Sequence, residues 1–455
     1  MPLIERQTSA DPRSRLRTAL LLVAMALAGF ALTVWVFYPG VMTYDAMYVY
    51  RAIEEGRVGD WQSPLMTALW ALVDPLAPGS GSMFLLIAAL YWLAFGVLAL
   101  ALRRRCPGLA IVLLLTALVS PAFALLGSIW RDVLFANVWM LGCALAFASR
   151  DRTRAAALAL QGAAIALLVL GLLLRPNALF AAPILGAYML SPSRLQWRRL
   201  VHGYLPAVLG FYGLVQVVYY GVFDAMRQNP LHSLLVFDLG GISHFTKQNQ
   251  FPVVWTPDET RLLTQDCYNP SLWDVYWTRQ PCSFVMARLE RDKIFGAATL
   301  VSAWKSAVVA HPLAYLRHRF AFMGTFLAGE NLTMWTQQLD DMSKAVFSDK
   351  PAYLAFKRWH DLLKPTPLFK AGSWLVVCVV VLALGWRRRN QPVGAFAVAL
   401  SASAIIYTLT FFIFGVASDF RYALWAVIAG TAAGVVVLCR DDWVIDAHQP
   451  SKVAG

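Results

Sequence analysis

Charged residues are scarce in this chain. They make up 14% of the 455 residues, whereas 59% are hydrophobic, and the mean hydropathy is +0.56. Low-complexity tracts, polar linkers and short repeats are also lacking, which excludes a disordered protein and a solenoid of soluble repeats. The apolar residues instead fall in blocks of roughly 18 to 22, the length that crosses the hydrocarbon core of a bilayer. The composition therefore predicts an all-α polytopic membrane protein.

Patterns that bind structural metals are missing as well. The seven histidines are scattered and no paired Cys or His motif is present, so a structural zinc site is not expected. Cys267 and Cys282 both fall in a segment assigned below to the outside of the membrane, where an oxidising compartment favours a disulfide between them. No disulfide is expected among the remaining cysteines, which lie in or beside apolar blocks: Cys106, Cys143, Cys378 and Cys439.

The formal net charge of +13 would suggest a nucleic-acid partner in a soluble protein, but here the arginines occur in short bursts between apolar blocks. Such bursts orient membrane helices, because basic loops stay in the cytoplasm. If the amino-terminal tail, with Arg6, Arg13, Arg15 and Arg17, is cytoplasmic, all the later bursts fall on the cytoplasmic side as well. These bursts are Arg103 to Arg105; Arg150, Arg152 and Arg154; Arg194, Arg198 and Arg199; Arg387 to Arg389; and Arg440. The sequence thus predicts that both termini are cytoplasmic and that no nucleic acid is bound.

Ten apolar blocks are candidate spans, at residues 19–38, 84–102, 109–128, 132–149, 155–174, 176–190, 204–223, 372–386, 394–415 and 421–439. Three parts follow from them: 1–223 with seven spans and the first outer loop 39–83, a large outer segment 224–371, and 372–455 with three spans and the tail. A further apolar stretch, 294–310, would reverse the sidedness of the later basic loop if it spanned. We therefore favour a surface-lying helix there.

Three arginines depart from the orientation rule, since Arg131, Arg175 and Arg421 stand next to spans on the outer side. A cation at that position is costly if it tips into hydrocarbon, so the binding of an anion is one explanation. Simpler explanations stay open. Arg131 and Arg421 would pair with their neighbours Asp132 and Asp419, and Arg175 would reach the lipid head groups.

A lone acid, Asp45, follows the first span in the stretch YPGVMTYDAMYVYRAIEEGRVGDWQSPLM, residues 38–66. The apolar positions after it fit a short interfacial helix that stops at Gly56. Ser63 and Pro64 begin a second interfacial helix that is too short to span. Asp45 would cap the first helix, act chemically, or do both. The outer arginines would surround it with positive charge.

This first-loop stretch resembles that of the GT-C superfamily, the membrane glycosyltransferases that use polyprenyl-phosphate sugars. Four further segments fit the resemblance in order along most of the chain: RDVLFANVW, LLLRPNALFAAP, HPLAYLRHR and FRYALW. The resemblance implies a GT-C-like bundle of about ten transmembrane helices, with Asp45 as catalytic base. It makes Arg131, Arg175 and Arg421 candidates to bind the donor phosphate, and Asp60, Gln62, Tyr44 and Tyr422 candidates to bind substrate. Related loops often carry histidine where this chain has Gln62, which cannot titrate near neutral pH.

The activity implied by the resemblance is the transfer of a sugar from a polyprenyl-phosphate donor to a hydroxyl of lipid A, a surface polysaccharide or a protein. It would take place on the periplasmic face of a bacterial inner membrane. A lipid phosphate is already a good leaving group, so a base and a cationic clamp suffice, and a single displacement inverts the anomeric carbon. A retaining route would need a second acid near Asp45, for which Asp60 is the candidate. No further cofactor is expected, and a divalent metal stays open.

Three other classes of function stay open. A polysaccharide polymerase or ligase would use a pyrophosphate-linked donor, a lipid-linked sugar flippase or transporter would move its substrate across the bilayer, and a structural membrane protein would do neither. A transporter should carry ionisable groups near the middle of its spans, whereas the centres of these spans are almost free of charge. The sequence therefore favours chemistry at the outer face.

Overall fold

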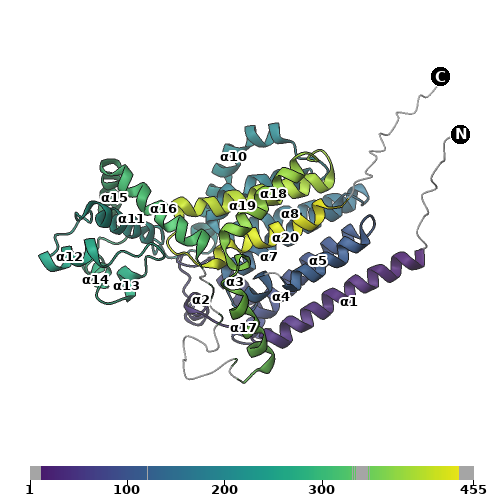
Figure 1. Ribbon diagram of the computed structural model, residues 1–455, viewed down its shortest axis with the longest axis horizontal. Helices are drawn as coiled ribbons and strands as arrows, with labels where there is room; N and C mark the ends of the chain where they lie inside the picture. Colours follow the sequence, from purple (N-terminus) through teal and green to yellow (C-terminus); the bar gives the residue numbers. More distant parts are fainter. Residues whose placement is uncertain are drawn as a thin grey trace.

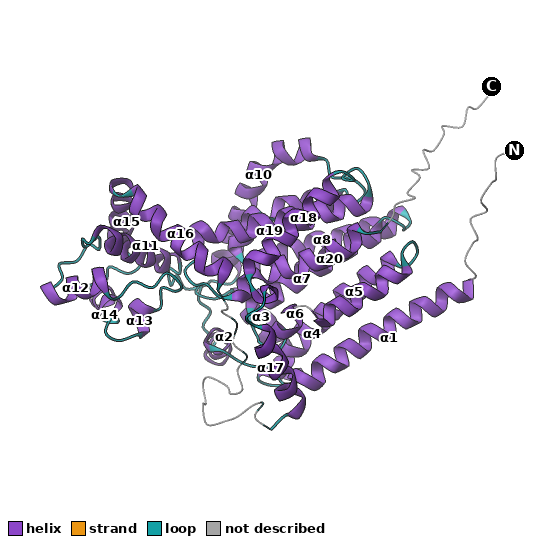
Figure 2. Ribbon diagram, in the orientation of Figure 1, coloured by secondary structure: helices purple, strands orange, loops and turns teal. Residues whose placement is uncertain are grey.

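The computed structural model describes residues 12–119, 121–329, 332, 334, 347 and 349–439. Within these ranges the regular elements are helices, joined by loops that contain three isolated β-bridges (Figures 1 and 2). The architecture is the all-α one that the sequence predicts. A helix satisfies its own backbone hydrogen bonds, which is what a chain of this hydropathy needs inside a bilayer.

A bundle of long apolar helices forms one part of the molecule (Figure 1). Among the residues that the structure describes, seven helical stretches are long and apolar enough to cross a membrane, namely Arg13–Phe37, Ser80–Leu102, Arg131–Ser149, Arg154–Leu174, Leu200–Val222, Pro392–Phe414 and Phe420–Val437. Shorter helices occupy three of the predicted spans, namely 109–128, 176–190 and 372–386. The first of these is interrupted at Pro121, which begins a separate helix, and the second at Pro183, which lies in the first turn of another helix. The bundle helices are α1 (Pro12–Phe37), α4 (Ser80–Leu102), α5 (Pro107–Val119), α6 (Pro121–Leu125), α7 (Arg131–Ser149), α8 (Arg154–Leu174), η2 (Pro176–Phe180), α9 (Ala182–Leu190), α10 (Trp197–Gln216), η3 (Val217–Val222), α18 (Ala371–Trp386), α19 (Pro392–Phe414), η5 (Phe420–Ala423) and α20 (Leu424–Val437).

Most of the segment predicted to be outer forms a lobe of shorter helices at one end of this bundle (Figure 1). The lobe contains α11 (Leu231–Thr246), α12 (Pro257–Gln265), α13 (Val275–Thr278), α14 (Phe284–Arg291), α15 (Ala298–Ala310) and α16 (Pro312–Ala328). The same segment continues with α17 (Pro351–Leu363), which lies beside α1, and η4 (Pro367–Phe369), which contacts α18 (Figure 1). The helix α15 covers most of the stretch 294–310, packs on α11 and is too short to span. The structure pairs Cys267 with Cys282 within this lobe.

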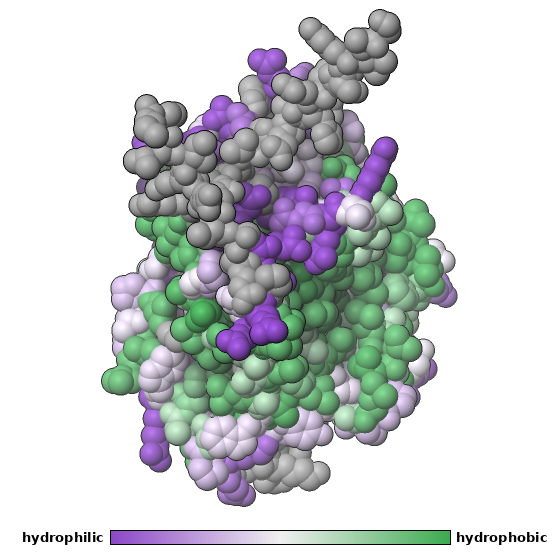
Figure 3. Space-filling model, turned by 90° about the vertical axis from the view of Figure 1, so that its right-hand side faces the viewer, coloured by the Kyte–Doolittle hydropathy of each residue, from purple (hydrophilic) through white to green (hydrophobic). Residues whose placement is uncertain are grey.

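The basic loops meet at the opposite end of the bundle. Arg388 donates to the carbonyls of Val437 (3.0 Å) and Cys439 (2.8 Å), and the carbonyl of Arg389 accepts from the amide of Leu195 (3.3 Å). Figure 3 faces this end and shows hydrophilic side chains gathered towards its middle, with hydrophobic ones to either side. Arg6 and Arg440 lie outside the described residues. The loops that share one charge pattern thus share one end of the molecule, as an orientation signal requires.

One expectation about the cysteines is wrong. Cys106 and Cys439, which are 333 positions apart, are joined by a disulfide at the end where the basic loops meet. The pairing follows from the packing of α5 against α20, which brings the start of one helix beside the end of the other. Neither composition nor spacing carries that information, because the contact depends on how distant helices pack. Cys143 and Cys378 are buried thiols.

The first outer loop folds as its local sequence predicts. The helix α2 (Tyr44–Glu55) ends at Gly56, whose φ of 64° lies in the left-handed region that favours glycine. The helix α3 (Pro64–Val73) begins at Ser63, which accepts a hydrogen bond from the amide of Met66 and precedes Pro64 in the first turn. The short element η1 (Asp74–Leu76) follows directly and leads into α4. The first turn of α2 is where Asp45 lies.

Candidate active site

Asp45 is held by side chains from two distant parts of the chain. Its Oδ2 lies 2.6 Å from Nη1 of Arg421 in η5, and its Oδ1 accepts a hydrogen bond of 2.9 Å from Nε2 of Gln62. The residue that precedes α2 as its cap is Thr43, not Asp45, and the Thr43 side chain makes no capping bond. The capping interpretation of Asp45 is therefore wrong, although a carboxylate in the first turn still gains from the helix dipole.

The surroundings of Asp45 keep its carboxylate charged. Loss of hydration alone would raise the pKa of Asp45, but the positive charges of Arg421, Arg131 and Arg175 oppose this, and the net result is a pKa below the ordinary value of 3.8. The side chain is still 36% exposed, so it is closely surrounded by protein and yet open to a reactant. Asp45 is thus an ionised carboxylate near neutral pH, within the field of three cations.

Gln62 and Ser63 tie this carboxylate to the end of α8. Gln62 is 5% exposed and contributes an uncharged donor to Asp45. The hydroxyl of Ser63 donates to the carbonyl of Leu173 at 2.9 Å, two residues before Arg175. The neutral amide therefore orients Asp45 without competing with it for a proton.

Arg175 forms a buried ion pair with Asp132, which is the first-turn acid of α7. Its Nε lies 2.8 Å from Oδ1 of Asp132 and 3.3 Å from the hydroxyl of Tyr407, and the two charged side chains are 8% and 5% exposed. The guanidinium also lies 4.9 Å from the ring centroid of Tyr422. Two sequence interpretations are therefore wrong, since Asp132 pairs with Arg175 and not with its neighbour Arg131, and Arg175 does not reach out to the head groups.

Arg421 is shared between two carboxylates. Besides Asp45 it contacts Asp419, whose Oδ2 lies 3.4 Å from Nε and whose Oδ1 accepts from the Arg421 amide at 3.0 Å. Its Nη2 also donates to the Tyr422 hydroxyl at 3.2 Å, and its guanidinium lies 4.8 Å from the ring centroid of Trp130. The proposed pairing of Arg421 with Asp419 is present, but it is only part of the arrangement.

Arg131 is the least committed of the three outer arginines. At the first position of α7, its Nη1 makes one long hydrogen bond of 3.4 Å to the carbonyl of Trp61. Within the described residues it has no carboxylate within ion-pair distance, although its charge reaches Asp45. Arg131 thus retains donors for an anion from outside the protein.

The other candidates from the sequence lie around this cluster in different ways. Tyr422 contacts both Arg175 and Arg421, so it lies within it. Tyr44 is 70% exposed at the start of α2 and joins none of the hydrogen bonds described above. Asp60 lies apart from Asp45, because its Oδ2 accepts from the Tyr220 hydroxyl at 2.7 Å and its Oδ1 from the Gln228 amide at 2.6 Å.

Gln228 holds the first outer loop against the chain that follows α10. Its Oε1 accepts from the Tyr48 hydroxyl at 2.6 Å and from the Trp61 amide at 3.0 Å. A Cβ at Gly59 would lie 2.2 Å from the same oxygen, so only glycine allows this close approach. Asp60 and Gln228 together thus fasten the loop on which Gln62 is carried.

Sequence reasoning did not single out Asp274, whose charge interacts with that of Asp45. Asp274, at the start of α13, is exposed, and its pKa is raised first by loss of hydration and then by the negative charge of Asp45. The pKa of Asp419 is also raised, chiefly by burial. The stretch SLWDVYW that contains Asp274 mixes one acid with aromatic residues, as the Asp45 stretch does, and this was the available signal. No group of three or more His, Cys, Asp or Glu side chains suited to a metal ion is found in the part of the chain that the structure describes.

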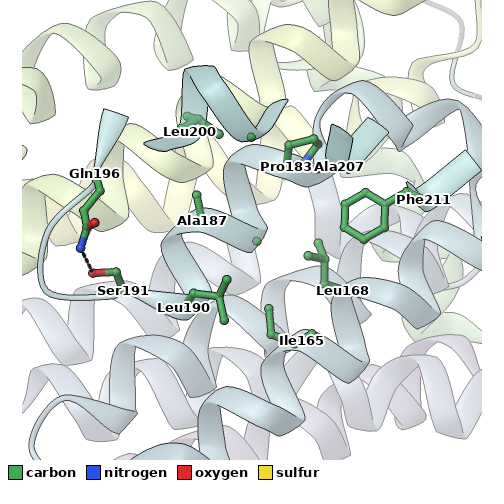
Figure 4. Close-up of a pocket in the computed structure, with 12 residues that line it drawn as sticks. Ile165, Leu168, Pro183, Ala187, Leu190, Ser191, Gln196, Leu200, Ala207 and Phe211 are labelled. Carbon is green, nitrogen blue, oxygen red and sulfur yellow. Dashed lines mark hydrogen bonds between the residues drawn. The ribbon is translucent and has the colours of Figure 1, made fainter. Parts of the chain in front are cut away.

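Two apolar cavities flank α10, the helix that stands at the edge of the bundle (Figure 1). The first, of about 480 Å³, lies between α8, α9 and α10 and is lined by residues that include Leu168, Ala187, Gly203 and Phe211 (Figure 4). The second, of about 680 Å³, is lined by residues of α9, α10, α18 and α19, among them Trp386. Leu168 precedes Arg175 by seven positions on α8, which is about 10 Å along the helix.

No family model and no curated protein match the chain. Two solved structures are similar to it, both of ArnT from Cupriavidus metallidurans. The one bound to undecaprenyl phosphate aligns with 90% of this chain and 77% of that chain, at 15% identity and a TM-score of 0.34. The apo structure aligns with 92% of this chain and 78% of that chain, at 15% identity and a TM-score of 0.32. ArnT is a GT-C glycosyltransferase, of the superfamily to which the sequence motifs are similar.

Proposed function

We propose that this protein is an inverting membrane glycosyltransferase that moves a sugar from a polyprenyl-phosphate donor to a hydroxyl on the outer side of a bacterial inner membrane. The observation that carries the proposal is the position of one ionised carboxylate, Asp45, among three arginines of which one, Arg131, has no carboxylate partner in the described chain. A base and a free cation side by side are the two groups that this transfer needs.

Arg131 binds the donor phosphate in this proposal. The charge of Arg175 is balanced by Asp132, and that of Arg421 is shared with Asp45 and Asp419. An anion that enters the site therefore finds its strongest available donor in Arg131, which can bind two phosphate oxygens at once. Arg421 becomes a second phosphate ligand once Asp45 no longer holds it.

Asp45 accepts the proton of the attacking hydroxyl. Before the donor binds, the neighbouring arginines lower its pKa, which makes it a weak base. A phosphate that takes up Arg131 and Arg421 removes this effect, and the loss of hydration at Asp45 then raises its pKa. The base is thus strengthened when the donor is present, a contribution of about 10² to 10⁴-fold in rate.

The reaction is one displacement at the anomeric carbon. The acceptor oxygen forms a bond to this carbon as the bond to the phosphate oxygen breaks, the proton passes to Asp45, and polyprenyl phosphate leaves with one more negative charge. Asp45 becomes neutral in the same step, while Arg131 and Arg421, already bound to the donor phosphate, stabilise the charge that develops on the leaving group. No covalent sugar intermediate is needed, so the product has inverted configuration.

The polyprenyl chain occupies the apolar cavity between α8, α9 and α10 in this proposal. The cavity begins near Leu168, about 10 Å along α8 from Arg175. The prenyl chain reaches the cavity from the bilayer, so its affinity comes from close packing against the lining and not from leaving water, and even part of a chain that fits would add affinity. The similarity to ArnT bound to undecaprenyl phosphate agrees with a donor of this class but assigns no residue.

The transporter alternative is less well supported by the distribution of charge. In the helices long enough to span, charged residues stand in the first turns, for example Arg131 and Asp132 in α7 and Arg154 in α8. A substrate path across the bilayer would place ionisable groups near the middle of the described helices. A polymerase or ligase with a pyrophosphate-linked donor differs in donor chemistry, which an assay can separate.

The test is mass spectrometry of lipopolysaccharide, surface polysaccharide and envelope-protein glycans from strains with wild-type protein, a deletion, Asp45→Asn or Glu54→Gln at matched membrane abundance. Glu54 is exposed on the same helix and serves as the control. We expect one sugar to be lost in the deletion and in Asp45→Asn and kept in Glu54→Gln. Purified protein should use a monophosphate-linked and not a pyrophosphate-linked donor. A sugar that persists in Asp45→Asn contradicts the assignment of the base.

A further inference from the structure

Three tryptophans from two distant parts of the chain come together beside the candidate site. The ring centroid of Trp61 lies 6.1 Å from that of Trp273 and 5.6 Å from that of Trp277, and the last two rings lie 5.4 Å apart. Trp273 is buried, whereas Trp277 is 42% exposed. The cluster is therefore not a closed core, because part of its aromatic surface faces outward.

The backbone connects this cluster to both sides of the site. Trp61 precedes Gln62, the hydrogen-bond donor of Asp45, and its carbonyl accepts from Arg131. The amide of Trp273 donates to the carbonyl of Val416 at 2.9 Å, and the amide of Ser418 donates to the carbonyl of Ser271 at 2.7 Å. The residues 271–273 thus run antiparallel to the turn that leads into Arg421.

A carboxylate without a partner stands next to the tryptophans. Asp274 follows Trp273 directly, is exposed, and has no side-chain hydrogen bond or ion pair to any residue in the described ranges. The charge of Asp45 is felt at Asp274, and so is that of Arg421. Asp274 therefore lies within electrostatic reach of the groups that carry the proposed chemistry.

We infer that Trp61, Trp273, Trp277 and Asp274 form a subsite for a sugar ring of the acceptor, so that the attacking hydroxyl belongs to a saccharide; this rests on the proposed function. One face of a pyranose carries C–H groups, which pack on the negative face of an aromatic ring, while a carboxylate accepts hydrogen bonds from neighbouring hydroxyls.

Charge separates the two substrates. Asp274 repels the donor phosphate, which Arg131 attracts, and accepts the uncharged hydroxyls of a sugar. A tryptophan that only anchors the protein at the membrane interface needs no carboxylate at its side. The combination of an open aromatic surface with a free carboxylate is therefore explained by a polyhydroxylated ligand and not by membrane anchoring.

The experiment uses the full chain in detergent or nanodiscs and the envelope saccharide that the wild-type protein glycosylates. The Michaelis constants for acceptor and donor are measured for wild type, Trp277→Ala, Trp277→Phe and Asp274→Asn. We expect Trp277→Ala to raise the acceptor KM about tenfold, Trp277→Phe to raise it about twofold because the aromatic face is kept, and Asp274→Asn to raise it about fivefold. The donor KM should not change. Trp35→Ala and Glu290→Gln are matched controls, since Trp35 is 69% exposed in α1 and Glu290 is exposed in α14.

Each outcome decides the inference. A raised donor KM would assign the subsite to the donor sugar and overturn the inference. Unchanged constants in active variants would exclude any subsite at the tryptophans. If the wild-type protein glycosylates a protein side chain and not a sugar, the saccharide assignment fails while the proposed transfer stands. If the wild-type protein transfers no sugar at all, the proposed function itself fails.

Binding without catalysis gives a second measurement. Saturation-transfer NMR with methyl pyranosides, in the absence of donor, should show contacts with the wild-type protein and the Trp35→Ala control. The signal should fall strongly in Trp277→Ala. Equal signals in wild type and Trp277→Ala would contradict the inference even if no acceptor had been identified.

Discussion

The two arginines Arg131 and Arg175 should respond in opposite ways to the same substitution. Arg131 has no carboxylate partner among the described residues, whereas Arg175 neutralises the buried Asp132. We therefore expect Arg131→Gln to abolish most activity while the protein stays folded. Arg175→Gln should instead destabilise the protein, because it leaves a buried carboxylate unpaired.

The structure sets the size of both effects. Loss of one or two charge-assisted hydrogen bonds to the departing phosphate lowers kcat about 10² to 10³-fold, as the removal of a transition-state donor does elsewhere. Removal of one partner from a buried ion pair costs about 3–5 kcal/mol of folding stability. The Arg175–Asp132 pair qualifies for the second estimate, since its side chains are 8% and 5% exposed.

The measurement pairs a transfer assay with a thermal unfolding curve of the purified protein. Arg131→Lys should recover part of the activity, because it restores the charge but not the two parallel donors of arginine. Wild-type kcat/KM in Arg131→Gln would refute the assignment of the phosphate ligand. An unchanged unfolding temperature in Arg175→Gln would refute the reasoning about the buried pair.

Three further predictions follow from the described geometry. In the free protein the arginines hold the pKa of Asp45 below 3.8, so its stabilising ion pair is lost only as pH falls through that lowered pKa. A donor phosphate that binds these arginines raises the pKa of Asp45, so the acid limb of kcat should lie at higher pH than the acid limb of kcat/KM. The reverse order in pH–rate profiles would contradict donor-dependent activation. Gly203→Leu should raise the KM for a long-chain donor about tenfold and leave the KM for a two-isoprene analogue unchanged. Gly210→Leu is the control and should change neither KM, since both glycines have open space around a Cβ but only Gly203 lines the cavity. Differential alkylation with mass spectrometry should find Cys267–Cys282 and Cys106–Cys439 oxidised and the buried Cys143 and Cys378 as thiols; alkylation of Cys106 without a reductant would contradict the pairing at the basic end.

Local sequence carried enough information for the elements of the fold. Apolar length predicted the helices of the bundle, and short-range signals predicted the ends of the interfacial helices, such as Gly56 after α2 and Ser63 before α3. These features depend on interactions between residues a few positions apart, which a sequence displays directly. The convergence of Asp45 with Arg421 followed from sidedness, since outer loops of one bundle share one surface.

Pairing within the site could not be read in the same way. Asp132 lies next to Arg131 in sequence but binds Arg175, because the first turn of α7 faces the end of α8. Asp274 lies 229 positions after Asp45 and reaches its neighbourhood only through the antiparallel contact of 271–273 with the turn before Arg421. The Cys106–Cys439 bond has the same origin. All three depend on the relative placement of helices, for which one sequence contains no direct measure.

In the proposed mechanism, the hydrogen bonds of Gln228 would link the donor's lipid chain mechanically to Asp45. Gln228 follows α10, which lines the apolar cavities on one side, and its amide oxygen holds the loop that carries Gln62 on the other. An outward shift of α10 to admit a long chain would pull on this loop and change the angle at which Gln62 meets Asp45. The enzyme would then sense whether its lipid is seated before its base is aligned, which favours a compulsory order with the donor first and protects the activated sugar from water.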